Sequence, residues 1–242
     1  RWISSAASDV YKRQMTNREL RQLSDDFFQN SLVSSPTSAI MRGYKEYFDQ
    51  IENLTEETFD KEQQLVNQFI TKLENIDLST LSNREKITPG MLEFALSSSK
   101  DALLDKSWEF GAGVSGYTGY LIDYNQRLFI PDVESADMLL KRLELYERLY
   151  TQIAKVQKVG LLNGRVATKR NLLRTIDQLE NYLNTPLDKD TLLLVNFSTD
   201  IGELEVSKWK EKAKKIIETN VRPAVLAYLD QLREEHLPKG RT

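Results

Sequence analysis

Apolar residues recur every three or four positions along most of this chain, which is the spacing that places them on one face of an α-helix. The longest such stretches predict helices over about residues 55–76, 133–160, 167–183 and 203–235. Pro223 lies inside the last stretch and predicts a bend there. The apolar stripes of the first, second and fourth stretches are Phe59, Leu65, Phe69, Leu73 and Ile76; Leu139, Leu143, Tyr146, Leu149, Ile153 and Val156; and Ile217, Val221, Ala224, Tyr228 and Leu232.

Helix start signals predict three further helices. Thr16-x-x-Glu19 and Ser82-x-x-Glu85 are capping boxes, in which two side chains satisfy free backbone N–H groups, and they predict helices over about 16–32 and 82–106. Pro36 suits the first turn of a helix and predicts another, up to Ile51. Pro89-Gly90 predicts a kink or a short preliminary turn near the start of the helix over 82–106.

Two stretches do not follow the helical period. Residues 107–131 contain four glycines among several aromatic residues. Residues 187–202 include DTLLLVNF, an apolar run that fits a buried strand or a helical turn, and periodicity does not decide between them. No internal repeat, linker or clear domain boundary is visible. The sequence therefore predicts an all-α protein, built as an irregular multi-helix array.

The first 14 residues are interpreted as foreign to the protein. SSAASDVYKRQ, Ser4 to Gln14, lacks the apolar core of about 7–15 residues that a secretory signal needs. Back-translation of these eleven residues gives a transposase-based sequencing-library adapter read in frame. We therefore expect residues 1–14 to be an artefact and residues 15–242 to be native, with truncation at the C-terminal side and Met15 as an internal residue or the start.

Composition narrows the class of protein. The chain has 40% hydrophobic and 29% charged residues, which is typical of a folded globular protein. Without residues 1–14 it carries 30 basic and 35 acidic residues, a net charge of −5. We therefore expect no nucleic-acid partner, because nucleic-acid binding needs a basic surface. No apolar stretch approaches the roughly 18 residues of a membrane span. The absence of cysteine excludes disulfides and cysteine-ligated metals.

GAGVSG, Gly111 to Gly116, satisfies the G-x-G-x-x-G spacing of dinucleotide-binding loops. Such a loop follows a strand and opens a helix, whereas here a predicted helix ending in KSWEF precedes it. We interpret it as a flexible glycine loop. The aromatic residues of WEFGAGVSGYTGYLIDY fit the lining or lid of a pocket, or simple packing at the rim of the helical array.

No residue is nominated as catalytic, cofactor-binding or metal-binding. His236 is the single histidine, and an H-E-x-x-H zinc site needs two imidazoles one helical turn apart. We expect His236 to be solvated, near the negative end of a helix dipole. The basic run KWKEKAKK, Lys208 to Lys215, is interpreted as a solvated helix face balanced by glutamates. The carboxylate pairs Asp25-Asp26 and Glu56-Glu57 have no distinguishing context.

Four segments carry a family resemblance. SPTSAIMRGYKEYFDQI has the spacing Ser-Pro-x-x-Ala-x-x-x-Gly, and LENIDLSTLSNREKITPGMLEFAL follows it. In order and spacing, these segments and two later ones resemble the bacterial domain of unknown function 885 family over nearly all of 30–240. Ala167 or Thr168 stands where members usually carry proline, and His236 where tyrosine is usual. The matching residues are Ser35, Pro36, Ala39, Gly43, Ile76, Asp77, Leu81, Ser82, Leu140, Arg142, Leu143, Gly160, Gly164, Val221, Pro223, Ala224, Leu229, Leu232, Glu235, Leu237 and Pro238.

The resemblance implies a protein larger than this chain. Family members are roughly twice as long, largely helical and similar to zinc metallopeptidases of the neurolysin or carboxypeptidase-Taq type, with a histidine-rich H-E-x-x-P-G-H-like motif in their second half. Nothing here matches that motif, so no catalytic residue is carried over and zinc is implied for the full-length family protein alone. The implied fold is the N-terminal half of a larger zincin-like helical fold.

We therefore expect the N-terminal, non-catalytic half of a zinc-dependent peptidase-like hydrolase, which forms one wall of the substrate cleft and is inactive alone. Its partners would be the missing C-terminal half of the same chain and a peptide substrate. The alternative is a stand-alone helical scaffold or binding module that uses residues 107–131 for recognition. The location would be cytoplasmic if Met15 is the true start, and exported or lipid-anchored if an upstream signal has been lost.

Overall fold

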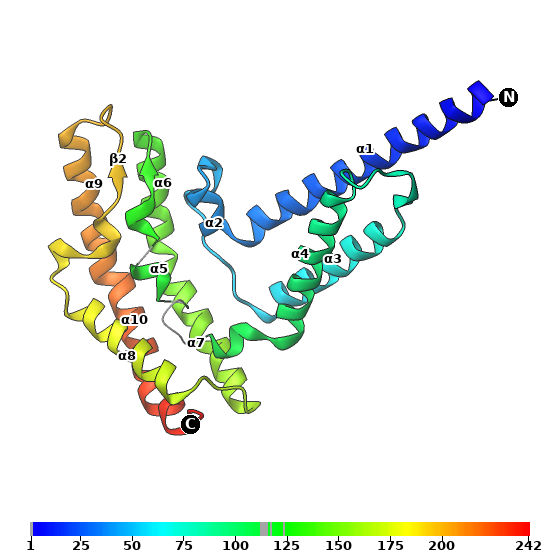
Figure 1. The fold of residues 1–242 in the computed structure, drawn as a ribbon. Coiled ribbons are helices and arrows are strands. Elements are labelled where there is room, and N and C mark those ends of the chain that lie inside the picture. Colours follow the sequence, from blue (N-terminus) through cyan, green and yellow to red (C-terminus); the bar gives the residue numbers. More distant parts are fainter. Residues whose placement is uncertain (1, 112–115, 117, 123) are drawn as a thin grey trace. The chain divides into compact units, whose positions relative to one another are not determined.

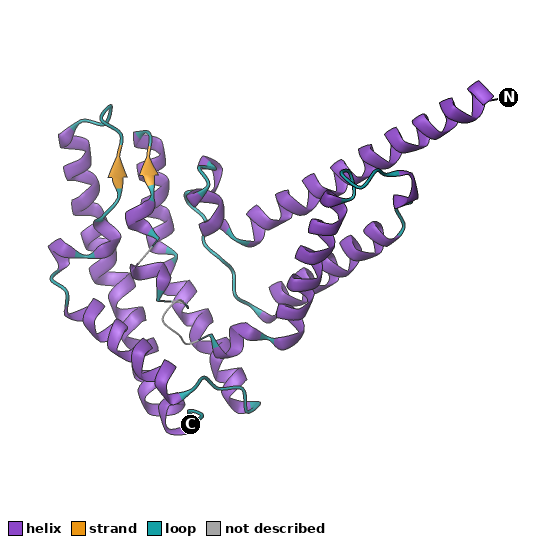
Figure 2. Ribbon diagram, viewed as in Figure 1, coloured by secondary structure: helices purple, strands orange, loops and turns teal. Residues whose placement is uncertain are grey.

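The structure is a computed structural model (Figure 1). It describes residues 2–111, 116, 118–122 and 124–242. Helices make up almost all of its regular structure (Figure 2), and the predicted all-α class is confirmed. The chain divides into two compact units. Unit 1 comprises Arg1–Ser34 and Glu56–Lys106, and unit 2 comprises Ser35–Thr55 and Ser107–Thr242. Because each unit combines two separate stretches of chain, no linker in the sequence marks the division.

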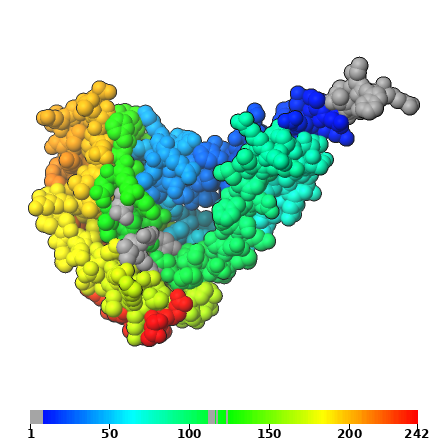
Figure 3. Space-filling model, viewed as in Figure 1, coloured from blue at the N-terminus to red at the C-terminus, as the bar shows by residue number. Residues whose placement is uncertain are grey.

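Unit 1 is built from three helices, α1 (Trp2–Ser34), α3 (Glu56–Glu74) and α4 (Ile87–Asp105). α3 and α4 pack along each other, as the ribbon (Figure 1) and the space-filling view (Figure 3) both show, and α1 contacts α3. The helix predicted over 55–76 is thus confirmed. Its buried face belongs to an apolar core that contains Leu20, Leu23, Val66, Phe69, Leu73, Leu81, Leu92 and Leu96.

The start of α1 differs from the prediction. The capping box at Thr16 does not begin the helix, which extends without a break from Trp2 to Ser34. Thr16 is buried within it and its hydroxyl group lies 3.4 Å from the carbonyl oxygen of Asp77. The physical reason is that residues 2–14 contain neither glycine nor proline, so nothing stops the helix from continuing past the capping residue.

The second capping box forms, but it does not begin α4. The Ser82 hydroxyl donates to Glu85 Oε2 at 2.6 Å, and the Ser82 N–H donates to the same oxygen at 2.9 Å. The residues that follow form a turn, and the α-helix starts at Ile87. The short preliminary turn predicted from Pro89-Gly90 is therefore present, and Pro89 lies buried in the first helical turn, where a missing N–H group costs nothing.

Unit 2 contains the larger core. α10 packs against α7 and α8, and α6 packs against α9 (Figure 1). The stripe predicted from Leu139 to Val156 lies at its centre, where Leu139, Leu143 and Leu149 are fully buried. The helices of this unit are α2 (Pro36–Met41), α5 (Gly119–Ile122), α6 (Val133–Glu144), α7 (Tyr146–Leu162), α8 (Lys169–Asn184), α9 (Glu203–Ile216) and α10 (Arg222–Gln231).

The helix predicted from Pro36 to Ile51 is shorter than expected. α2 ends at Met41, because Gly43 adopts a left-handed conformation with φ of +91°. The Gly43 N–H donates to the Ile40 carbonyl at 3.0 Å, and the Tyr44 N–H donates to the Ala39 carbonyl at 3.1 Å. This pair of bonds is the Schellman motif, which closes a helix and favours glycine. The chain then continues through a short 3₁₀ turn, Lys45–Tyr47.

The predicted helix over 133–160 is divided at Leu145, whose N–H bonds to the Arg142 carbonyl three residues back at 3.0 Å. α7 then ends in a second Schellman motif, in which Gly164 has φ of +74° and the Arg165 N–H donates to the Gly160 carbonyl. Gly160 has a separate role: a Cβ there would lie 2.4 Å from the carbonyl oxygen of Glu109. Only glycine lets residues 107–110 approach α7 this closely.

DTLLLVNF forms a helical turn, and the short strand after it is not the buried strand that was the other alternative, because Asn196 is exposed and Phe197 half-buried. Thr191–Leu193 is a 3₁₀ turn, and Asn196–Phe197 is the short strand β2. β2 pairs in parallel with β1 (Phe129–Ile130), with Phe129 opposite Asn196.

The last predicted helix is confirmed with two local departures. α9 and α10 are joined by a π-helical turn at Ile217–Val221, and a second π-helical turn, Leu232–His236, follows α10. Pro223 lies in the first turn of α10, directly after the first π-helical turn. A proline ring displaces the carbonyl four residues earlier, and a wider helical turn at that point accommodates it. None of the helices described here is both long enough and apolar enough to cross a membrane.

Candidate functional site

One pocket of unit 2 combines a buried carboxylate with hydroxyl and aromatic side chains. Its volume is about 350 Å³, which is in the range of sites for small organic ligands. We call it the Glu52 pocket. It is formed by residues of α2 and the chain that follows it, together with residues at and after α5, and its lining consists of Ser35, Thr37, Ser38, Met41, Arg42, Glu52, Tyr120 and Tyr124.

Glu52 is the buried charged residue of this pocket, with 6% of its surface exposed. Its Oε1 accepts the Thr37 N–H at 3.0 Å and the Ser35 hydroxyl at 3.3 Å, and its Oε2 accepts the Thr37 hydroxyl at 2.7 Å. An ionised carboxylate has about four acceptor positions. The three bonds hold Glu52 in one orientation and leave capacity for one more donor.

Arg142 supports Glu52 from the interior. The guanidinium group comes from α6 and is 1% exposed. Its Nη2 donates to the Thr37 hydroxyl oxygen at 2.5 Å, and its Nη1 donates to the Gln50 carbonyl oxygen. The Thr37 hydroxyl thus accepts from Arg142 and donates to Glu52. Since a buried carboxylate is costly without a nearby positive charge, Arg142 allows Glu52 to remain buried when no ligand is bound.

Two tyrosines form the aromatic part of the pocket. The rings of Tyr120 and Tyr124 meet edge to face, with centroids 5.5 Å apart. The hydroxyl of Tyr146, a buried residue of α7, donates to the Tyr120 carbonyl at 2.9 Å. Burial raises the pKa of Tyr146 to about 12, so the phenol keeps its proton at neutral pH and continues to donate. The pocket wall is therefore anchored to the core of unit 2.

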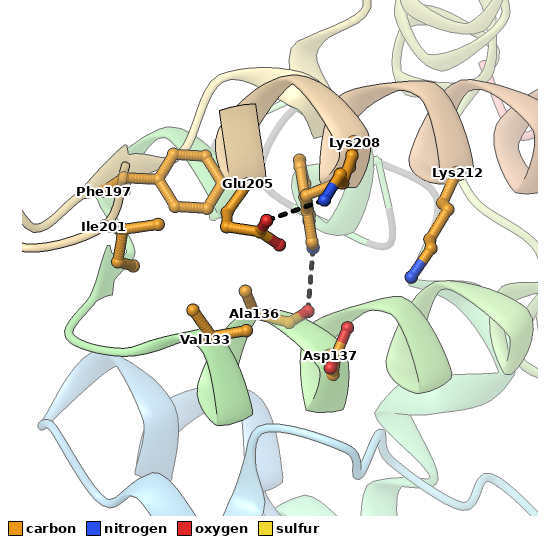
Figure 4. A pocket seen from close by; sticks show the side chains of 9 residues that line it. Val133, Ala136, Asp137, Phe197, Ile201, Glu205, Lys208 and Lys212 are labelled. Atoms are coloured by element: carbon orange, nitrogen blue, oxygen red, sulfur yellow. Dashed lines mark hydrogen bonds and ion pairs between the residues drawn. The ribbon is translucent and has the colours of Figure 1, made fainter. Parts of the chain in front are cut away.

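A second pocket of unit 2 lies between α6 and α9 (Figure 4). Val133, Ala136, Phe197 and Ile201 supply its apolar side, and the indole N–H of Trp209 donates to the Ala136 carbonyl at 2.8 Å. Its volume is about 20 Å³, which is room for about one water molecule. This pocket is therefore a small gap left where Trp209 of α9 packs against α6.

Unit 1 has a larger, apolar groove of about 470 Å³ beside α3 and α4. Leu73, Pro89 and Leu96 are among its buried lining residues. The charged side chains at the groove, those of Glu74, Lys86, Glu93 and Lys100, are all exposed. Without a buried polar group to orient a ligand, this groove is a weaker candidate for specific binding than the Glu52 pocket.

The expectation of a solvated His236 is wrong. The residue is 3% exposed and lies in the π-helical turn Leu232–His236. The physical reason is that this end of the helix packs against two other helices of unit 2. The turn contacts α8, and Lys158 of α7 forms an ion pair with Glu235 at 3.0 Å. In the part of the chain that the structure describes, no group of three or more His, Cys, Asp or Glu side chains could hold a metal ion.

The other sequence candidates do not form a site among the described residues. Most of the GAGVSG loop, residues 112–115, lies outside them, as does residue 117. In KWKEKAKK, Lys208 pairs with Glu205 at 2.8 Å and Lys214 with Glu211 at 2.9 Å, which confirms the balanced helix face, while Trp209 points into the core. Asp26 accepts a hydrogen bond from Gln22, and Glu57 pairs with Lys61 on the surface of unit 1.

Comparison with known families decides the relationship. The model of the family described as "Bacterial protein of unknown function (DUF885)" matches residues 36–242. The chain belongs to the DUF885 family. This result confirms the resemblance that the four sequence segments indicated. No curated protein matches the chain.

Two solved structures share the fold of this DUF885 chain. A protein from Colwellia psychrerythraea, described as a "putative lipoprotein", matches with a TM-score of 0.70 and 14% identity; the match covers 96% of this chain and 42% of that chain. A "putative lipoprotein of unknown function" from Shewanella oneidensis matches with a TM-score of 0.59 and 19% identity, over 88% of this chain and 37% of that chain. The chain spans less than half the length of either protein.

Four of the residues that carried the resemblance have one of two structural roles. Gly43, Gly160 and Gly164 shape the backbone, whereas Arg142 supports the Glu52 pocket. The pocket was not predicted from the sequence. Arg142 did carry a signal for it, since this charged residue lies beside Leu139 and Leu143 in a helix whose apolar stripe is buried. A charged residue in that position predicts a buried polar partner.

No comparable signal marks Glu52, which lies outside any helix. Of the aromatic residues in 107–131, Tyr120 and Tyr124 do line a pocket, one of the two roles that the sequence left open.

Proposed function

We propose that this chain is the non-catalytic N-terminal part of a larger zinc-dependent, peptidase-like hydrolase, and that the Glu52 pocket belongs to one wall of its substrate cleft. The observation that carries the proposal is the fold match that covers 96% of this chain but 42% of the Colwellia protein. Further support comes from the ordered sequence motifs, which resemble a family whose members are similar to zinc metallopeptidases.

The residues of the Glu52 pocket suit binding rather than metal ligation. The lining described for it has one carboxylate and no imidazole, whereas zinc in a hydrolase is held by several nitrogen or carboxylate ligands. Zinc, bound elsewhere in the full-length protein, would activate the attacking water. This chain would then position the substrate, with Glu52 accepting a hydrogen bond and the tyrosine rings contacting its side chains.

The proposal is tested by extending the chain. The coding sequence is read beyond Thr242 at the native locus, and the extended protein and the 242-residue chain are assayed with a fluorogenic peptide library and for bound zinc. We expect the extended protein to bind zinc and cleave peptides, and the 242-residue chain to do neither. A stop codon directly after Thr242, or zinc-dependent cleavage by the 242-residue chain, would contradict the proposal.

A substitution in the extended protein tests the role of the pocket. Because Glu52 is assigned to binding, Glu52→Gln should raise KM about tenfold while kcat changes little. Glu57→Gln changes an exposed carboxylate of unit 1 in the same way and serves as the matched control. A fall in kcat at unchanged KM would assign Glu52 to the chemical step instead.

The second candidate is a stand-alone binding module without catalysis. It is favoured by one observation: the described lining of the Glu52 pocket comes entirely from unit 2, so the pocket forms within this chain. A native gene that ends at this chain, together with ligand binding by the chain alone, would support this candidate over the first.

A further inference from the structure

We propose that the Glu52 pocket recognises the positively charged amino group of its ligand, with Glu52 as the anchor. This inference deepens the proposed function, on which it rests, because it names the chemical class that the pocket takes. It also applies to the stand-alone module, since both candidates use the same pocket.

The negative charge of the pocket has a fixed position. Glu52 is the single anionic side chain among the described residues that line the pocket, and it is held there by three hydrogen bonds. All three fix it from the side of Ser35 and Thr37. The acceptor position that remains suits an N–H donor of the ligand, and a charged donor gives the stronger bond. Burial further strengthens the attraction, because little water screens it.

The charges around the pocket favour a cation over an anionic ligand. Arg142 is positively charged, but its Nη1 and Nη2 groups donate to Gln50 and Thr37, and it does not line the pocket. Arg42 lines the pocket and is exposed, so solvent and salt screen its charge. An anion in the pocket would therefore meet the fixed carboxylate of Glu52 without an equally buried cation facing it.

The aromatic wall of the pocket also suits a cation. Tyr120 and Tyr124 line the same pocket as Glu52. A cation within about 6 Å of an aromatic ring is attracted to the ring face, so rings and a carboxylate together form a site for an ammonium group. The volume of about 350 Å³ accommodates a molecule the size of an amino-acid amide. An amino group of this kind occurs at the N-terminus of a peptide and in polyamines.

The test measures binding to the 242-residue chain by isothermal titration calorimetry. The probes are phenylalanine amide, its N-acetylated form and putrescine. We expect phenylalanine amide to bind about tenfold or more tightly than the acetylated form, which has lost the charge. Putrescine separates the two sources: weaker binding than phenylalanine amide points to a peptide N-terminus, and equal or tighter binding to a polyamine.

Variants connect the binding to the pocket. Glu52→Gln should weaken the binding of phenylalanine amide about tenfold, and Tyr124→Leu should weaken this binding less. Glu57→Gln on unit 1 should leave the affinity unchanged. A readout on the unaltered chain covers the case in which Glu52→Gln does not fold. The backbone N–H of Thr37 donates to Glu52. Its signal in a ¹H–¹⁵N NMR spectrum should shift when phenylalanine amide is added and should not shift when the acetylated form is added.

Three results would overturn the inference. They are equal affinity for the free and acetylated probes, no effect of Glu52→Gln in a folded protein, and no binding of any amine at about 10 mM. Because none of these measurements uses catalysis, their failure is distinct from failure of the proposed function, which the peptide cleavage assay on the extended protein tests.

Discussion

The two units of this DUF885 chain are stabilised by different kinds of contact. The core of unit 1 is apolar, and its ion pairs, such as Lys61 with Glu57, lie on the surface. Unit 2 places charged side chains in its interior: Arg142 is bonded to Thr37 and Gln50, Asp190 to Arg222, and Glu109 to Arg165.

The difference explains where the candidate site lies. Apolar packing tolerates many arrangements of similar volume, whereas a buried charge is stable in an arrangement that satisfies its hydrogen bonds. In unit 2, the polar network of Arg142, Thr37 and Glu52 reaches the surface at a pocket. In unit 1, the polar side chains at the groove are exposed and free of such constraints.

The largest expected effect comes from Asp190, which is fully buried. Its Oδ2 accepts from Arg222 Nη2 at 2.9 Å and from Nε at 3.2 Å. Asp190→Ala removes the carboxylate partner of the partly buried Arg222, which keeps its bond to the Thr185 carbonyl, and should lower the free energy of unfolding by about 2–4 kcal/mol, measured by urea denaturation. Glu57→Gln, which breaks an exposed pair of unit 1, should not shift the denaturation midpoint measurably. Similar shifts for both variants would remove the distinction between the units.

A glycine pair gives the next largest effect. In unit 2, Gly160→Ala places a methyl group 2.4 Å from the Glu109 carbonyl oxygen, so the backbone must move. The expected loss of stability is about 1–3 kcal/mol. In unit 1, Gly90→Ala meets nothing within 4 Å and should stabilise α4 by up to about 1 kcal/mol. Thermal unfolding of both variants measures the effects, and a destabilising Gly90→Ala would show that unit 1 is packed as tightly as unit 2.

The exposed apolar face of unit 1 predicts an effect on association rather than on stability. Ile87, Met91 and Phe94 lie along one side of α4, and Phe94 is 75% exposed. Phe94→Glu should change stability by less than about 0.5 kcal/mol and reduce self-association, measured by light scattering after gel filtration. Leu173→Glu, at an exposed site of unit 2, is the control and should leave association unchanged. Equal effects of both substitutions would mean that added charge alone reduces association.

The smallest effect concerns the pKa of Glu85 in unit 1. Hydrogen bonds from Arg13 and then Ser82 lower this pKa from 4.5 to about 2. The stability that these bonds give is therefore complete above pH 4.5 and is lost as the pH falls toward 2. Arg13→Ala should raise the pKa, while Ser82 keeps it below 4.5, in a carboxylate NMR titration. An unchanged pKa would mean that the Arg13 contact does not form in solution.

Much of the fold could be predicted because its information is local. The helices over 55–76, 167–183 and 203–235 follow from the spacing of their apolar residues, and each has a buried face in the structure. Helix ends were less predictable. α1 begins before the capping box at Thr16 and continues past it. α2 ends near Gly43 although apolar residues follow this glycine.

The Glu52 pocket could not be predicted, because it depends on contacts between distant residues. Thr37 and Arg142 are separated by 105 positions and share one hydrogen bond. Glu52 and Tyr120 lie in segments without a regular period, so nothing in either segment indicates that they line the same pocket. Sequence patterns report which face of an element is buried, but they do not report which polar groups meet there.

Hydrogen exchange of the 242-residue chain, with and without phenylalanine amide and read by mass spectrometry, tests most directly whether the ligand site lies in unit 2. We predict that the ligand slows exchange in peptides from residues 35–55 and 118–128 of unit 2 and leaves α3 and α4 of unit 1 unchanged. Slower exchange confined to the groove of unit 1 would contradict the account, because it would place ligand binding on the apolar unit.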